Sequence, residues 1–196
     1  MDKKETIITL FRKNNGLLTL QNLADVGINK YHLGKLIATN EVERLKPGLF
    51  KLIDYNLNSY HQITKLIPNG IFCLYSAWAF YELTTYMPHE FHIAIEKKSK
   101  IKLPEYPPIK LYYWEEKMLN IGIDTQTEDG TSFHIYALEK SVCDAVKFRN
   151  KIGTDILNEV LKGYLKRKDK NLERLIGFSR KLKVEKILKN YLEILL

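Results

Sequence analysis

The stretch from Gly16 to Leu52 constrains the fold of this chain most, because two short helical patterns and a hairpin pattern follow one another with almost no linker. Leu20–Val26 is predicted to be a helix capped by Thr19, and Gly27 supplies the backbone freedom that a tight turn requires. Another helix is expected over residues 30–39. With one more helical pattern before them, these elements follow the helix-turn-helix order, in which the last helix can lie in a DNA major groove.

The helix expected over residues 30–39 carries the polar side chains that a DNA reader needs. Leu33, Leu36 and Ile37 form one apolar stripe, which leaves the polar residues on the other side. Asn29 is placed to cap this helix. The residues expected nearest the base edges or the neighbouring backbone are Asn29, Lys30, Tyr31, His32 and Lys35.

The segment "VERLKPGLFKL" is predicted to be a hairpin that turns at Pro47 and Gly48. Its apolar residues, which are available to cover the helices, are Val42, Leu45, Phe50 and Leu52. Its cations are Arg44, Lys46 and Lys51, and we expect them to lie beside DNA phosphates. Helix order, turn and hairpin together predict an N-terminal winged helix-turn-helix domain over residues 1–55.

The remainder, residues 56–196, is expected to form a second domain of mixed α/β structure that ends in a helical C-terminus. The polar, turn-rich segment "DYNLNS" marks the boundary. A helix capped by Ser59 is followed by a compact apolar helix in "SAWAFYEL", by strands in "FHIAIE" and "PIKLYYW", and by a hairpin turning at Asp129 and Gly130. The fold class of the whole chain is therefore predicted to be α+β.

Charge and composition narrow the class of partner. The chain has 196 residues, 45% of them hydrophobic, and its 31 Lys and Arg against 23 acids give a formal net charge of +8, which favours nucleic acid or another polyanion. No apolar window reaches the ~18 residues that a membrane span needs, so we expect a cytoplasmic protein with no membrane partner. Cys73 and Cys143 have no CxxC spacing and are expected to be buried thiols.

Three segments together resemble the AbiEi antitoxins of type IV toxin–antitoxin systems. They are the helix-turn-helix and hairpin region, the block "NGIFCLYSAWAFYEL" (Asn69–Leu83) and the block "LEKSVCDAVKFRNKIGTDILNEVLKGYL" (Leu138–Leu165). This resemblance implies a DNA-binding antitoxin that represses its own operon and counteracts a co-encoded nucleotidyltransferase-like toxin. Composition and spacing by themselves indicate only a basic winged helix joined to a second domain.

The second block contains a polar group whose role the sequence leaves open. On a helix, Asp144 and Lys147 would form an i, i+3 pair on the exposed side, while Val142, Cys143 and Val146 would pack inward. One interpretation is a set of ordinary surface ion pairs. The other, which the resemblance favours, is an antitoxin patch for a partner or for DNA phosphates, made of Asp144, Lys147, Arg149 and Asn150.

A search for catalytic chemistry gives one weak candidate. Glu96 and Lys98 have the ExK spacing by which restriction-type nucleases place a metal-binding carboxylate beside a lysine, and the further acid would come from Glu90 or Asp124. His61, His89, His92 and His134 lack metal-ligand spacing, and no phosphate loop or nucleophile elbow is present, so no cofactor or metal is expected. The alternatives to a repressor and antitoxin are therefore a nuclease directed to DNA by the winged helix and a protein-docking regulator without catalysis.

Overall fold

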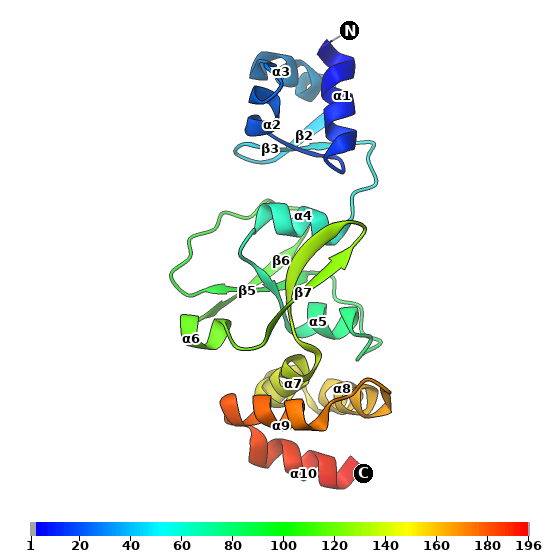
Figure 1. Cartoon of the computed structure of the whole chain (residues 1–196), viewed down its shortest axis with the longest axis vertical. Helices are drawn as coiled ribbons and strands as arrows, with labels where there is room; N and C mark the ends of the chain where they lie inside the picture. Colours follow the sequence, from blue (N-terminus) through cyan, green and yellow to red (C-terminus); the bar gives the residue numbers. More distant parts are fainter. Residues whose placement is uncertain (1–2, 196) are drawn as a thin grey trace. The chain divides into compact units, whose positions relative to one another are not determined.

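The computed structural model describes residues 3–195 and contains two compact units (Figure 1). The first unit comprises Met1–Pro68, Ile101–Pro104 and Thr127–Ser132, and the second comprises Asn69–Lys100, Glu105–Gln126 and Phe133–Leu196. The expected domain boundary at residue 55 stays a prediction. The first compact unit continues beyond that residue, to Pro68.

The first unit begins with helices and a small antiparallel sheet, an arrangement compatible with a winged helix-turn-helix. The helices are α1 (Lys3–Lys13), α2 (Leu20–Ala24) and α3 (Lys30–Ala38), and the strands are β1 (Leu17–Thr19), β2 (Val42–Lys46) and β3 (Leu49–Leu52), in the order β1-β3-β2. The hairpin of β2 and β3 is the predicted one. Strand β1, which the sequence patterns did not indicate, pairs with β3 on its other side.

Local signals fix where these helices begin. Thr19 accepts a hydrogen bond from the backbone N–H of Asn22, and the Asn22 side chain accepts one from the backbone N–H of Thr19, which completes a capping box. Asn29 caps α3 as expected, its Oδ1 accepting from the Tyr31 N–H at 2.9 Å. The helices pack around a core of Ile7, Phe11, Leu18, Leu23, Leu33, Leu36, Val42, Phe50 and Leu52.

The first unit continues into α4 (Ser59–Leu66). Its cap is Asn58 rather than the expected Ser59, because the Asn58 side chain accepts hydrogen bonds from the backbone N–H groups of Tyr60 and His61. A serine one position later, already in the first turn, cannot reach the same groups.

The second unit is built on a mixed five-stranded sheet. Its strands are β4 (Ile71–Phe72), β5 (Phe91–Glu96), β6 (Ile109–Trp114), β7 (Ile123–Glu128) and β8 (Thr131–Tyr136), in the order β6-β5-β4-β8-β7. β4 runs antiparallel to β5 and parallel to β8, and β5 runs parallel to β6. The predicted hairpin turns at Asp129 and Gly130, both with positive φ. The α+β class is thereby confirmed.

Helices make up the rest of the second unit and end the chain. They are α5 (Leu74–Phe80), α6 (Glu116–Leu119), α7 (Leu138–Ile152), α8 (Thr154–Lys166), α9 (Leu172–Lys181) and α10 (Glu185–Leu195). The last four gather together (Figure 1), and α5, α8, α9 and α10 all contact α7. Cys73 and Cys143 are both free and buried, as expected. Among residues 3–195, no helix is long and apolar enough to cross a membrane.

Two helical glycines provide a matched test of this packing. A Cβ on Gly163, in α8, would lie 2.9 Å from the carbonyl oxygen of Leu83, whereas a Cβ on Gly177, in α9, meets nothing within 4 Å. We expect Gly163→Ala to destabilise the second unit by about 1–3 kcal/mol through overpacking against backbone. Gly177→Ala is expected to stabilise it by up to about 1 kcal/mol through helix propensity. Thermal unfolding of both variants checks the pair, and equal effects on the melting temperature would contradict it.

Candidate nucleic-acid interface

Helix α3 has one packed side and one uncovered side. Leu33 and Leu36 are buried in the core of the first unit, and Lys30, Tyr31 and Lys35 are exposed, with 64% of the Tyr31 surface accessible. The apolar stripe predicted for this helix is therefore the side that holds it in place. The same spacing leaves most of its polar residues outward.

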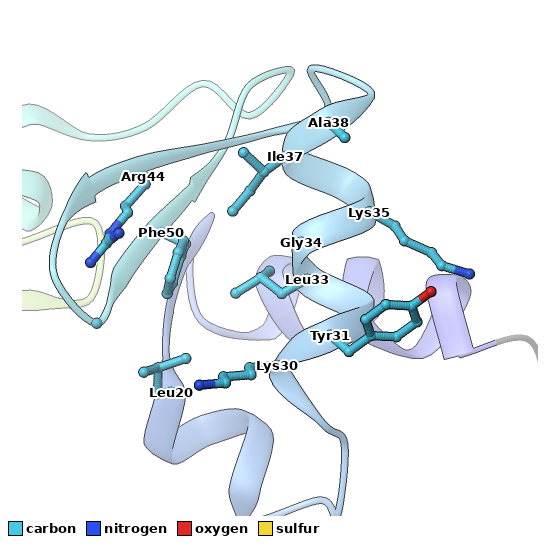
Figure 2. Close-up of a pocket in the computed structure, with 11 residues that line it drawn as sticks. Leu20, Lys30, Tyr31, Leu33, Gly34, Lys35, Ile37, Ala38, Arg44 and Phe50 are labelled. Atoms are coloured by element: carbon cyan, nitrogen blue, oxygen red, sulfur yellow. The ribbon is translucent and has the colours of Figure 1, made fainter.

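A groove of about 640 Å³ separates α3 from the β2–β3 hairpin (Figure 2). We call it the α3–hairpin groove. Its lining includes the apolar side chains of Leu20, Leu33, Ile37 and Phe50. Lys30 and Arg44 also line it, one from the start of the helix and one from the hairpin, so cations stand on both sides of an apolar floor.

Tyr31 and Lys35 project from the side of α3 that faces away from the hairpin (Figure 2). The Lys35 Nζ lies 5.0 Å from the centroid of the Tyr31 ring, within the range of a cation–π contact. The His32 ring meets the Tyr31 ring edge-on at 5.6 Å between centroids. These three side chains thus form one connected aromatic and basic cluster on this flank.

A second hollow, of about 340 Å³, lies between α1 and α3. We call it the α1–α3 hollow, and its lining includes Lys3, Lys4, His32, Lys35 and Glu41. Glu41 accepts hydrogen bonds from Lys4 and Thr39, both at 2.8 Å, and these lower the pKa of its carboxyl group. Glu41, the one acid that the described residues contribute to the hollow, is thus ionised and paired with Lys4, and Lys3 and Lys35 add two further cations.

Gly34 lies on the uncovered surface of α3, where a Cβ would meet no protein atom within 4 Å. Glycine in the middle of a helix costs about 0.5–1 kcal/mol relative to alanine, and among residues 3–195 no side chain or backbone outside its own helix turn packs against this position. The helix backbone is therefore open to a close approach here. A glycine inside a helical pattern is the sequence signal at this position.

The eight predicted DNA-binding residues do not share one setting in the structure. Lys30, Tyr31, Lys35 and Arg44 line the α3–hairpin groove, and His32 lines the α1–α3 hollow with Lys35. Asn29 has its Oδ1 engaged by the helix cap, so its first role is structural. The structure does not place Lys46 or Lys51 with the others.

Lys46 is not presented freely at the hairpin turn, contrary to expectation. Its Nζ donates a hydrogen bond to the backbone carbonyl of Leu66 at 2.9 Å, and desolvation there lowers its pKa. Lys51 lies on the face of β3 opposite to that of Phe50, because successive side chains alternate, and it pairs across the ladder with Glu43. The three hairpin cations therefore do not share one face, and of them Arg44 lines the groove, while their contact with DNA stays a prediction.

Asp144 was also predicted to lie on the exposed side of its helix. The expected exposed position is wrong, because Asp144 is 1% accessible and its Oδ2 accepts a 2.6 Å hydrogen bond from the Nζ of Lys140, itself fully buried. All residues of α7 from 139 to 146 are buried, so this part of the helix passes through the core. Lys147 and Asn150 are exposed as predicted, and Arg149 donates to the Val146 carbonyl.

The acids proposed for a nuclease site do not converge. Glu96 ends β5 and Glu90 precedes it, which separates them by roughly 20 Å along an extended strand. Asp124 lies on β7, three strand positions from β5 and hence roughly 14 Å away. Glu90 also forms an ion pair with Lys110 at 3.2 Å. In the part of the chain that the structure describes, no three His, Cys, Asp or Glu side chains gather as a metal site.

Comparison with known proteins adds no family assignment. No family model matches the chain, and no curated protein gives a significant match.

The sequence patterns did not predict several residues of this surface. Lys3 and Lys4 line the α1–α3 hollow although they belong to α1, and Leu20 from α2 and Phe50 from β3 both line the groove. Only Gly34 had a local signal. The others come together through contacts between elements distant in sequence, which no periodicity reports.

Proposed function

We propose that this protein is a DNA-binding repressor of its own operon and an antitoxin that counteracts a co-encoded nucleotidyltransferase-like toxin. The DNA contact is the uncovered side of α3 with the β2–β3 hairpin. The observation that carries this proposal is the arrangement around Gly34, where an accessible stretch of helix backbone is flanked by cations from α3 and from the hairpin.

The chemistry of these side chains suits a duplex. Lys30, Lys35 and Arg44 can each neutralise a phosphate, and Lys35 can alternatively donate to a guanine edge. The apolar floor of the α3–hairpin groove suits the methyl group of thymine. Gly34 lets the helix backbone approach a groove wall more closely than any residue with a Cβ would.

The antitoxin part of the proposal rests on the resemblance of Asn69–Leu83 and Leu138–Leu165 to the AbiEi family. With Asp144 buried, the exposed part of the suggested patch reduces to Lys147 and Asn150 at the C-terminal half of α7, with the half-buried Arg149 beside them. A partner would therefore meet a basic surface, which suits an acidic face.

A protein-docking regulator is the second candidate, and one observation favours it. The floor of the α3–hairpin groove is apolar, and Leu20 is 42% exposed there, which also suits an amphipathic helix of a partner. A gel shift at physiological salt with the DNA upstream of the gene separates the two. A retarded complex that random DNA does not compete away supports the repressor, and no complex with any DNA supports docking.

The flanking cations give the first prediction about DNA binding. Replacing Lys30, Lys35 and Arg44 together by Gln should weaken binding to operator and random DNA alike. The slope of log affinity against log salt should fall by as much as about 2.7, since each phosphate contact contributes roughly 0.9. Fluorescence anisotropy at several KCl concentrations measures both. The single variants Arg44→Gln and Lys51→Gln, on the two faces of the hairpin, are the matched pair; an equal loss of affinity in both would refute the assignment.

Gly34 gives a prediction in which stability and binding move in opposite directions. Gly34→Ala should stabilise the fold by about 0.5–1 kcal/mol, because alanine favours helix and its methyl group meets no protein atom. The same methyl group should weaken operator binding by obstructing the approach of the helix. Gly177→Ala in α9, also stabilising and also in open space, should leave operator binding unchanged. A variant of Gly34 with full operator affinity would exclude this part of α3 from the interface.

The antitoxin patch is tested in cells that carry the co-encoded toxin under an inducible promoter. The double variant Lys147→Ala with Arg149→Ala should lose protection against the toxin while keeping operator binding. Lys162→Ala with Lys166→Ala, at two exposed lysines on α8, is the charge-matched control. Asp144 is left intact because its removal would strand the buried Lys140 charge at a cost of about 3–5 kcal/mol. Full protection by the double variant would contradict the antitoxin patch and identify these residues as ordinary surface residues.

A further inference from the structure

A separate pocket of about 260 Å³ lies in the second unit, between β6 and one side of α7. Lys140, Asp144, Lys147 and Phe148 line it from α7, at spacings that place them on one side of a helix. Trp114 lines it from β6. We call it the aromatic pocket.

The inner part of the aromatic pocket is a buried ion pair. The Lys140 Nζ lies 2.6 Å from Asp144 Oδ2, and it also lies 3.1 Å from the centroid of the Tyr136 ring and 4.2 Å from that of Trp114. The Lys140 ammonium is thus surrounded by one carboxylate oxygen and two ring faces. Asp144 Oδ1 accepts no hydrogen bond from residues 3–195, and it is left for a donor on an occupant.

The walls of the pocket are aromatic. The rings of Trp114 and Phe148 are nearly parallel, with 24° between their planes and 6.2 Å between their centroids. Tyr113, half exposed, lines the outer part. Flat rings of this kind stack on planar heterocycles with little regard to their identity.

The volume and the charge balance restrict what can bind. At 260 Å³ the pocket falls below the ~300–1,000 Å³ of sites for drug-sized ligands, so it holds one planar ring system. Because the Lys140–Asp144 pair carries no net charge, a charged group placed against it would stay uncompensated. The inner end of the occupant must therefore be neutral and must carry an N–H donor.

The mouth of the pocket has the opposite preference. Glu115 is engaged by Lys97 at 2.6 Å, which neutralises the acid at the rim. Lys147 is exposed and has no ion-pair partner among the described residues. An anionic group on the outer end of the occupant is favoured there.

We infer that the aromatic pocket binds a nucleobase that carries a phosphate, with the base against Trp114 and Phe148, a base N–H group on Asp144, and the phosphate at Lys147. The base can belong to a free nucleotide or to the end of a single strand, since both present the same groups. This site is distinct from the α3 surface, and the inference does not rest on the proposed DNA binding.

Calorimetric titration of the full chain tests the inference with the four ribonucleoside 5′-monophosphates, the nucleosides and ribose 5-phosphate. At least one monophosphate should bind about two- to fivefold more tightly than its nucleoside, the size of one exposed charge contact. Ribose 5-phosphate should not bind. A single-stranded tetranucleotide ending in the preferred base distinguishes the two sources: tighter binding than the monophosphate identifies a strand end, and weaker binding a free nucleotide.

Variants locate the binding. Lys147→Gln should reduce the affinity of the monophosphate to that of the nucleoside and leave the nucleoside unchanged, and Phe148→Leu should weaken both by about five- to a hundredfold. Asp144→Asn alone would leave Lys140 unpaired, so the pair is removed together as Lys140→Met with Asp144→Leu, with circular dichroism as the check on folding. This double variant should bind no base.

Lys35→Gln with Arg44→Gln is the control for the α3 surface and should leave nucleotide binding unchanged. The inference is overturned if no monophosphate binds the folded wild-type chain at millimolar concentration, if ribose 5-phosphate binds as well as the nucleotides, or if only the α3 variants impair binding. If the protein binds a nucleotide but not operator DNA, the result supports this inference and contradicts only the proposed function.

Discussion

The second unit depends on a buried ion pair between Lys140 and Asp144, four residues apart on α7. Taking each charge out of water costs several kcal/mol, so a pair like this needs good geometry and further compensation from its surroundings. Desolvation lowers the pKa of Lys140 and raises that of Asp144, while their mutual attraction opposes both shifts. The ring faces of Tyr136 and Trp114 supply the rest of the compensation.

The pair lies in α7, the central helix of its unit. Because residues 139–146 are buried on every side, α7 can receive α5, α8, α9 and α10 around it, as a surface helix could not. A second polar contact of α7 is also buried: the indole N–H of Trp78 donates a hydrogen bond to the carbonyl of Ser141 at 2.9 Å within the core. The Ser141 carbonyl and the Lys140 ammonium of α7 are therefore paired with neighbouring protein groups rather than with water.

What could be predicted from the sequence was local. Thr19 and Asn29 identify the starts of their helices, and Asp129 with Gly130 identifies the turn of a hairpin. Caps and turns can be recognised in this way because they act through bonds to residues two or three positions away. Asp144 was misjudged because charged residues are seldom buried, and the i, i+3 rule pointed to Lys147 when the true partner was Lys140 at i−4. Nothing near Lys46 in sequence indicated its bond to Leu66.

The candidate DNA surface was predicted in part for the same reason. The periodicity of α3 predicts which of its sides is exposed, so Tyr31 and Lys35 could be identified from the sequence. Gly34 is also visible in the sequence as a glycine inside a helical pattern. The hairpin was harder, because a strand sends alternate residues to opposite faces and a bulge between Arg44 and Lys46 shifts that alternation. Counting cations along such a segment overstates the charge on any one face. The charge that meets a ligand has to be counted by face. Here Arg44 from the hairpin and Lys30 from the helix stand at the groove, and Lys35 projects from the other flank of α3.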